Sequence, residues 1–371
     1  MPRILLLTAG FGEGHNTAAR CIAEALNEHP GVKTSVVDVY QETVPRFTKV
    51  LQAGYCLAIN KFPLIWSAIF SVLDQPGVLE KSLPFAGNLR KALQRIIEEY
   101  KPDAIVSTYP LYAYLIRQLR QKGHAPSLAP LLTVVTDSTA INSSWYRAGS
   151  EIFLLADEET AEVLRHAGVD PATLYVLGFP VAPRLAALKV CDGVIHGAKR
   201  ILYLPSSRVG HTIAVIRELL KLPDVEITIV TGRLHSLHQA IAATGVIDGV
   251  RTHLVGWTDK IPELLCTHHL YIGKAGGAIV HEAMAARCPI LVSHVVPGQE
   301  EGNIELIERH DIGRLAAYYP ESLALSVAEV FANKEATWKR WKRNLQTIAR
   351  PGASRDIAAF VLKTATQPTL K

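Results

Sequence analysis

Short apolar runs of the kind that form β-strands alternate with helical patterns along almost the whole chain. Residues 4–7 and 34–39 predict two strands, and residues 17–27 between them carry apolar side chains at helical spacing. Strands that are joined through helices form a parallel sheet covered by helices on both faces. We therefore expect an α/β fold of the doubly wound, Rossmann-like type.

The length of the chain and one break in its pattern predict two such domains with an active site in the cleft between them. A single hydrophobic core stops growing near about 250 to 300 residues, and this chain has 371. The sequence FPVAP at residues 179–183 interrupts the alternation, which then starts again. We expect a first domain at 1–180, a linker at 181–199, a second domain at 200–350, and a C-terminal helix and tail at 351–371 that packs back on the first domain.

The composition is that of an ordinary globular protein with a modest positive charge. Apolar residues make up 49% of the chain, charged residues 20%, and the net charge is +5. This charge favours anionic ligands or an acidic membrane surface, but without a run of Lys and Arg it does not indicate nucleic-acid binding. The tail at residues 338–364, which we expect to be helical, carries many basic residues.

The cysteines, the histidines and the lengths of the apolar runs indicate the cellular compartment of the protein and argue against several kinds of site. The five cysteines include no CxxC pair, so we expect a reduced cytosol and no disulfide framework. The histidine pairs at 235/238 and 268/269 have no third carboxylate or thiol ligand placed to complete a metal site, and we expect no metal site. No apolar stretch reaches about 18 residues, so we expect no membrane span, and any membrane contact must be peripheral.

One late stretch, residues 272–303, combines a strand, a glycine turn and the start of a helix. Lys274 precedes Gly276 and Gly277, where the backbone can approach a ligand and the N–H groups of the helix start suit a diphosphate. The next predicted strand, residues 289–296, ends in a polar cluster, at the edge where open α/β sheets bind ligands. We expect an anionic nucleotide here, with Glu282, Gln299 and Glu300 bonding to sugar hydroxyls.

A second glycine loop, GFGEGH at residues 10–15, follows the first predicted strand. The dinucleotide fingerprint G-x-G-x-x-G requires an acidic residue about 20 positions on, and Asp38 suits that role, but His15 occupies the third glycine position. The dehydrogenase interpretation is therefore weakened. A loop histidine with an ordinary pKa of about 6.5 can take a proton from a hydroxyl near neutral pH. The alternative is that His15 only caps or packs at the helix start.

Asp137 directly follows the predicted strand at residues 131–136. A carboxylate at the ligand edge of the sheet can orient His15 or an acceptor hydroxyl. It can equally bond its own backbone in an Asx turn, and both interpretations stay open.

In the second domain, polar and aromatic residues follow successive predicted strands. Ser207 and Arg208 lie in the first strand-to-helix turn, where hydroxyls and a positive charge suit a diphosphate. Arg233 and Trp257 follow the next two strands, and a flat base fits against the turn at Gly256 and Trp257.

Residues 45–84 break the α/β alternation with many aromatic residues and interspersed Lys and Arg. Helices that lie in a membrane interface have this composition. The alternative is a pair of core-packed helices with a solvated basic face. In the membrane interpretation, Phe62, Trp66 and Phe70 contact the membrane and bring a lipid acceptor to the first glycine loop.

Five segments, GEGHNTAA, VVTD, LVGWTDKIPELL, KAGGAIVHEAMAARCPILV and PGQEEGN, in this order, resemble the monogalactosyldiacylglycerol synthase and processive diacylglycerol glucosyltransferase family. That family is related to the MurG-type glycosyltransferases and has the two-domain GT-B fold. The resemblance covers nearly the whole chain. It implies an inverting transfer from a UDP-sugar to a lipid hydroxyl, such as that of diacylglycerol, with no metal or other cofactor.

The resemblance also implies roles for single residues. His15 matches the general base, and Gly276, Gly277, Glu282, Gln299 and Glu300 match donor-binding positions. The family usually has proline where Ala275 stands, and it is richer in histidine and aromatics after Asp137 than this chain. With the residues at the strand edges added, the expected donor site comprises Gly14, Ser207, Arg208, Arg233, Trp257, Lys274, Gly276, Gly277, Glu282, Gln299, Glu300 and Asn303.

The expected mechanism is a single displacement in which His15, aided by Asp137, deprotonates the acceptor while UDP leaves. The helix start at Gly276, with Arg208 and Lys274, stabilises the charge on the diphosphate. Two alternatives remain: a UDP-sugar 2-epimerase of similar fold, and a non-catalytic nucleotide-sugar-binding protein at a membrane surface. Residues 45–84 argue against the epimerase, which needs no acceptor surface.

Overall fold

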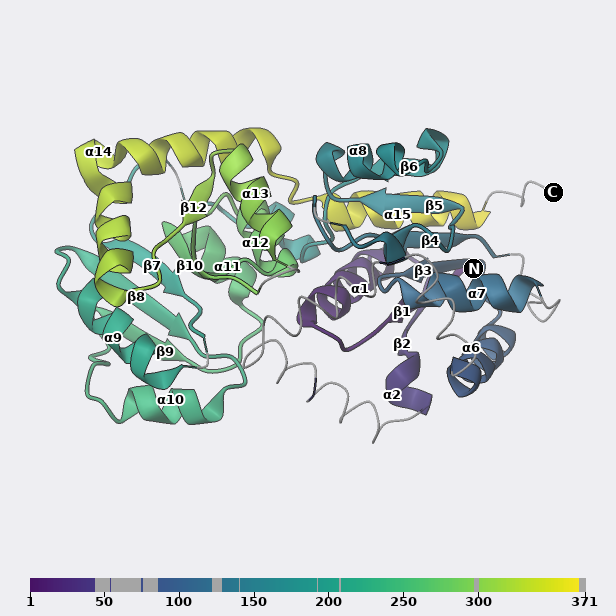
Figure 1. Cartoon of the computed structure of the whole chain (residues 1–371), viewed down its shortest axis with the longest axis horizontal. Coiled ribbons are helices and arrows are strands. Elements are labelled where there is room, and N and C mark those ends of the chain that lie inside the picture. The colour runs from purple at the N-terminus through teal and green to yellow at the C-terminus, as the bar shows by residue number, and fades with distance from the viewer. Residues whose placement is uncertain are drawn as a thin grey trace. The chain divides into compact units, whose positions relative to one another are not determined.

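The computed structural model describes residues 1–43, 54, 75, 86–121, 129–139, 141–191, 193–206, 208–296 and 300–366. The chain divides into two compact units (Figure 1). Each unit contains one six-stranded sheet, and the paired strands in both are parallel. This confirms the expected pair of Rossmann-like α/β domains. The first unit is formed by Met1–Pro183, Pro297–Gly302 and Gly352–Lys371, and the second by Arg184–Val296 and Asn303–Pro351.

The sheet of the first unit has the strand order β2-β1-β3-β4-β5-β6. The chain adds β2 on one side of β1 and all later strands on the other side. The direction of winding therefore reverses between β1 and β3, and ligands of open sheets bind at the carboxyl ends of such strands. The strands are β1 (Arg3–Thr8), β2 (Lys33–Asp38), β3 (Ala104–Ser107), β4 (Leu131–Val134), β5 (Ile152–Leu155) and β6 (Leu174–Val176).

Helices cover both faces of this sheet because β1 is apolar on both sides. Ile4 and Leu6 pack in one cluster with residues of α1 and α15, and Leu5 and Leu7 pack in another with α6 and α7. Such a continuous apolar run is typical of a buried parallel strand. The helices of this unit are α1 (Glu13–Asn27), α2 (Val39–Thr43), α6 (Gly87–Tyr100), α7 (Leu111–Gln121), α8 (Glu158–His166) and α15 (Ala353–Thr366).

The C-terminal helix α15 belongs to the core of the first unit. It packs against α1, and Ile357 and Val361 are fully buried in the cluster that contains Leu6. Outside that core, Arg355 Nε donates to Glu28 Oε2 across 2.6 Å.

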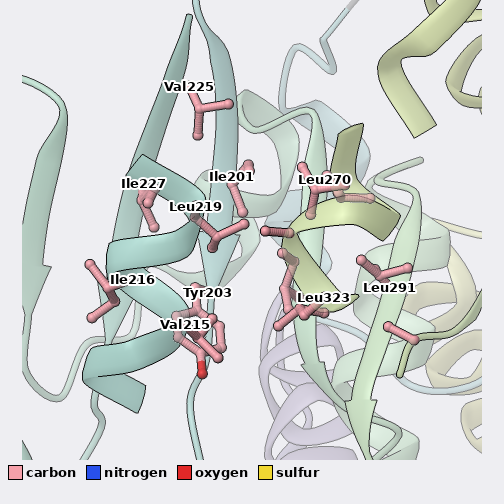
Figure 2. Close-up of a cluster of buried hydrophobic side chains, with 14 of the residues drawn as sticks. Ile201, Tyr203, Val215, Ile216, Leu219, Val225, Ile227, Leu270, Leu291 and Leu323 are labelled. Atoms are coloured by element: carbon pink, nitrogen blue, oxygen red, sulfur yellow. The ribbon is translucent and has the colours of Figure 1, made fainter. Parts of the chain in front are cut away.

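The sheet of the second unit has the order β12-β11-β10-β7-β8-β9, so its winding reverses between β7 and β10. Figure 2 shows the core on one face, where Ile201 and Ile227 of the sheet lie beside Leu219 and Ile216 of α9. The elements are β7 (Lys199–Tyr203), α9 (Val209–Leu220), β8 (Val225–Val230), α10 (His235–Ala242), β9 (Thr252–Val255), α11 (Ile261–Thr267), β10 (Leu270–Lys274), α12 (Gly277–Ala285), β11 (Ile290–His294), α13 (Glu301–Arg309), β12 (Gly313–Leu315) and α14 (Pro320–Ile348).

The predicted continuous helical tail at residues 338–364 is wrong in one respect. Helix α14 ends at Ile348, Ala349 is extended, and α15 starts only at Ala353. Pro351 explains the break, because proline lacks an N–H donor and disfavours a helical residue before it. The two helices consequently belong to different units. Among the described helices, α14 included, none has the length and apolarity to cross a membrane.

Candidate active site

The first glycine loop lies at the carboxyl end of β1, beside the reversal of winding. Gly12 has a φ of 104° and precedes α1, whose first turn has no side-chain cap. Asp38 at the end of β2 holds the loop: its Oδ2 accepts from Gly10 N at 2.9 Å and its Oδ1 from Gln41 N at 3.1 Å. Asp38, the acidic residue that suits a dinucleotide fingerprint, thus supports the loop through these two hydrogen bonds.

His15 is half-buried in the first turn of α1, and its ring is bonded to the strand-end residue Thr136. Nδ1 of His15 and Oγ1 of Thr136 lie 2.9 Å apart. Thr108, directly after β3, donates from its hydroxyl to the His15 carbonyl across 3.1 Å. Burial lowers the pKa of His15 to about 4, against an opposing contact with the Thr108 backbone. With this pKa the imidazole is in its neutral form at pH 7, but it is a weaker base than the ordinary histidine that the sequence predicts.

Asp137 is bonded to Trp145, not to His15. Trp145 Nε1 donates to Asp137 Oδ2 at 2.7 Å, and the Trp145 ring lies 5.8 Å from the His15 ring. Burial raises the pKa of Asp137 to about 6, although the bond from Trp145 lowers it. The sequence did not predict this bond to Trp145, and it leaves open whether Asp137 orients an acceptor hydroxyl. The catalytic role of Asp137 stays a prediction.

An aromatic cluster that the sequence analysis missed surrounds the His15 loop. The Tyr109 ring lies edge-on to His15 at 5.2 Å and stacks on Phe11 at 5.9 Å. Phe11 also meets Tyr40 edge-on at 5.1 Å, and Tyr112 donates to the Thr8 carbonyl at 2.8 Å. Tyr109 closely follows β3, so the rule that ligands bind at strand ends would have found it. The cluster gives this edge a half-buried apolar surface.

In the second unit, the glycine turn after β10 leaves the start of α12 open to a ligand. Gly276 is the N-cap, and no side chain caps the helix. Tyr271 Oη donates to the Lys274 carbonyl at 3.0 Å, and Asn303 Nδ2 donates to the Ala275 carbonyl at 2.8 Å. Asn303 is 5% exposed. Through this hydrogen bond Asn303 supports the glycine turn, whereas the sequence predicted only that it binds the donor.

Basic side chains gather at the ends of β7, β10 and β11, which are adjacent in the sheet. Lys274 and His294 are opposite each other in the β10–β11 register. Arg208, the N-cap of α9, donates from Nη1 to Tyr318 Oη at 2.6 Å. The positive charge here and the two open helix starts are suited to a diphosphate.

The turns after β8 and β9 also meet. The Arg233 guanidinium lies 5.7 Å from the centre of a Trp257 ring that is 60% exposed. A cation over an exposed indole face provides a flat platform for a base.

The remaining predicted site residues are placed as follows. Gly14 is the second residue of α1, and a Cβ built there has nothing within 4 Å. Glu282 is half-buried in α12, and Glu300 is 5% exposed in the first unit. Near Glu300, Thr139 donates to the Gly302 carbonyl at 2.8 Å. Five predicted residues lie outside the described part of the chain: Ser207, Gln299, Phe62, Trp66 and Phe70.

Metal ligands can be assessed only within the described ranges. Among those residues, no group of three or more His, Cys, Asp or Glu side chains is placed to hold a metal ion.

Comparisons with known proteins show which family the sequence resembles. Residues 15–181 match the family model of monogalactosyldiacylglycerol (MGDG) synthase. A processive diacylglycerol beta-glucosyltransferase of Bacillus subtilis is 23% identical, in an alignment that covers 100% of this chain and 97% of the relative.

Solved structures show the same fold at low sequence identity. Acinetobacter baumannii MurG aligns with a TM-score of 0.61 and 13% identity, over 98% of this chain and 100% of that one. The UDP-GlcNAc 2-epimerase of Neisseria meningitidis, bound to UDP-GlcNAc, aligns with a TM-score of 0.60 and 14% identity, over 97% and 100%. The fold alone therefore does not separate transferases from epimerases, whereas the family model and the sequence relatives do. The chain is therefore similar to the monogalactosyldiacylglycerol synthase and processive diacylglycerol glucosyltransferase family, and it is a glycosyltransferase of GT-B fold.

Proposed function

We propose that the protein transfers a hexose or N-acetylhexosamine from a UDP-sugar to the hydroxyl of a diacylglycerol-type lipid, with inversion at the anomeric carbon. The single observation that carries this proposal is the half-buried imidazole of His15, whose Nδ1 lies 2.9 Å from Thr136 Oγ1 at a sheet edge. The substrate class follows from the names of the relatives.

In the proposed step, His15 accepts the proton of the lipid hydroxyl as its oxygen attacks the anomeric carbon. The bond from that carbon to the diphosphate oxygen breaks, and its electron pair leaves with UDP. An attack from the side opposite the leaving group inverts the configuration. A base positioned in this way contributes a rate factor of about 10² to 10⁴.

The second unit stabilises the leaving diphosphate in this proposal. The open N–H groups at Gly276 and Gly277, with Lys274 and Arg208, are donors whose positions the fold sets before the reaction. Such fixed donors act where charge develops. We propose that they suffice without a metal ion. The Trp257 face takes the base, and Glu282 with Gln299 and Glu300 takes the sugars.

The aromatic cluster of Phe11, Tyr40 and Tyr109 provides apolar surface next to the proposed base. We propose that it receives the glycerol end of the acceptor. With a lipid acceptor and a net charge of +5, the protein would work at the inner face of the cell membrane as a peripheral protein.

The test is UDP release and glycolipid formation over liposomes that contain diacylglycerol, with UDP-glucose, UDP-galactose and UDP-N-acetylglucosamine as donors. We expect a glycosylated diacylglycerol with one of them, at an unchanged rate in EDTA. Formation of an epimer without lipid would establish the epimerase instead. Binding of UDP-sugars with neither product would establish a non-catalytic protein.

A further inference from the structure

Two histidines lie within the basic edge of the second unit. His294 ends β11, opposite Lys274 in the register, and Lys274 precedes the Gly276 helix start by two residues. Its Nδ1 lies 3.0 Å from the hydroxyl oxygen of Ser293. The imidazole of His294 thus belongs to the same strand edge as the proposed diphosphate site.

His211 is the third residue of α9 and lies in the open first turn of that helix. Its ring stacks on Tyr318, with centroids 4.4 Å apart and planes 7° from parallel. Tyr318 also accepts the hydrogen bond from Arg208, whose guanidinium lies 5.6 Å from the ring centre. Tyr318 therefore contacts both His211 and Arg208, and its own ring is 42% exposed.

The charged groups that shift the pKa values of these two histidines are all cationic. Burial, followed by Lys274, His211 and Arg208, lowers the pKa of His294 to about 4. Burial and Arg208 lower the pKa of His211. From the neighbouring elements, β10 contributes Lys274, the start of α9 contributes Arg208, and the segment before α14 contributes Tyr318. None of the described charges that shift the two histidines is a carboxylate.

An anion that binds here offsets the repulsion among the basic side chains of this cluster. A diphosphate diester carries two negative charges, and an opposite charge within about 4 to 6 Å raises the pKa of a histidine by about 1 to 3 units. For His294 that change moves the pKa from about 4 to about 5 to 7. Protonation would add donors to the oxygens of the diphosphate.

We propose that His211 and His294 are further ligands of the donor diphosphate and that they take up protons from solution as the UDP-sugar binds. Donor binding is then linked to pH and tightens as the pH falls. This inference rests on the proposed function, because the anion is the diphosphate of that donor.

The experiment is calorimetric titration of the full chain with UDP-glucose, UDP-galactose and UDP-N-acetylglucosamine in buffers of different ionisation enthalpy. The diphosphate diester of these donors does not titrate between pH 5 and 8, so any proton that is taken up binds the protein. We expect uptake of about half a proton or more at pH 6 and clearly less at pH 7.5.

Three variants identify the groups that take up protons. H294Q and H211Q should each reduce the uptake, and the double variant should abolish it and weaken binding at pH 6 by about tenfold. The matched control is H166Q, which removes an exposed histidine of α8 in the first unit; it should leave the uptake unchanged. If one single variant does not fold, the proton uptake of the other variant and the pH dependence of uptake by the wild type still test the inference.

Binding without proton uptake at pH 6, or uptake that persists in the double variant, would overturn the inference and leave the proposed function intact. If none of the three UDP-sugars binds, the proposed function fails, and the inference fails with it.

Discussion

Nδ1 of His15 lies 2.9 Å from Oγ1 of Thr136. The hydroxyl comes from the segment that follows β4 and the ring from the first turn of α1, so the bond joins two segments at the carboxyl edge of one sheet. With this contact the ring has a fixed direction from which to accept a proton.

Replacement of Thr136 by Val removes the hydroxyl and keeps the shape of the side chain. We expect kcat for glycolipid formation to fall about tenfold, because a base that loses its orientation loses part of its catalytic factor. KM for the UDP-sugar should change by less than about twofold. The matched control is T136S, which restores the hydroxyl and should restore most of the rate. A Val variant with wild-type kcat would show that the bond does not position His15.

Asp137 should give the pH profile an ionisation near 6, the value to which burial raises its pKa. If the carboxylate form is needed, kcat/KM falls as the pH drops through about 6 and is level above it. The variant D137N should abolish this fall in kcat/KM at low pH. Trp145→Phe removes the donor that lowers the pKa of Asp137, so the fall should begin at a higher pH. A profile that is identical in all three proteins would exclude Asp137 from the reaction.

Asn303 should control the geometry of the glycine turn. N303A leaves the buried Ala275 carbonyl without its donor, which costs about 1 to 3 kcal/mol of unfolding free energy. N303D places a carboxylate oxygen against that carbonyl and should cost more and weaken UDP-sugar binding further. Urea unfolding and calorimetric titration measure the two effects. Equal stability and affinity in the Ala and Asp variants would contradict this role.

Stability should fall with acid because several histidines are buried in their neutral form. Burial lowers the pKa of His268 to about 4, and its two ring nitrogens bond to Leu264 O at 2.7 Å and Thr228 Oγ1 at 2.8 Å. Between about pH 6.5 and 4 the unfolded chain binds a proton that the folded chain does not, so stability is present above 6.5 and is lost as the pH falls through this window.

For each such histidine, the unfolding free energy should drop by about 1 kcal/mol per pH unit in the window. Urea unfolding at pH 7, 6 and 5 measures the slope. H268Q should reduce the slope by about 1 kcal/mol per pH unit, the contribution of one buried histidine. H166Q removes an exposed side chain and should leave the slope unchanged. An unchanged slope in H268Q would show that His268 is not neutral in the fold.

The sequence predicts the positions of many proposed donor residues because strand order decides which turns share an edge. Lys274 ends β10, and Gly276 and Arg208 follow β10 and β7, between which the winding reverses. Apolar runs and glycines reveal these strands and turns without any knowledge of side-chain contacts. For the same reason the two-domain fold is predictable from the alternation alone.

The contacts that complete each half of the site are not visible in the sequence. His15 and Thr136 are 121 residues apart, and their bond depends on how α1 and the end of β4 are packed. The stacking of His211 on Tyr318 likewise joins α9 to a segment near β12. The strand β12 has three residues, too few for an alternation of apolar and polar residues to be recognised. The break before α15, in contrast, is visible in the sequence as Pro351 followed by Gly352.

The central claim is that His15 is the base that activates the lipid hydroxyl. The most direct test compares H15A with wild type for glycolipid formation over diacylglycerol liposomes and, in parallel, for UDP binding by calorimetry. We expect transfer to fall by at least about 10² while the UDP dissociation constant changes by less than about twofold. Transfer that persists near the wild-type rate, or UDP binding that is lost together with transfer, would contradict the claim.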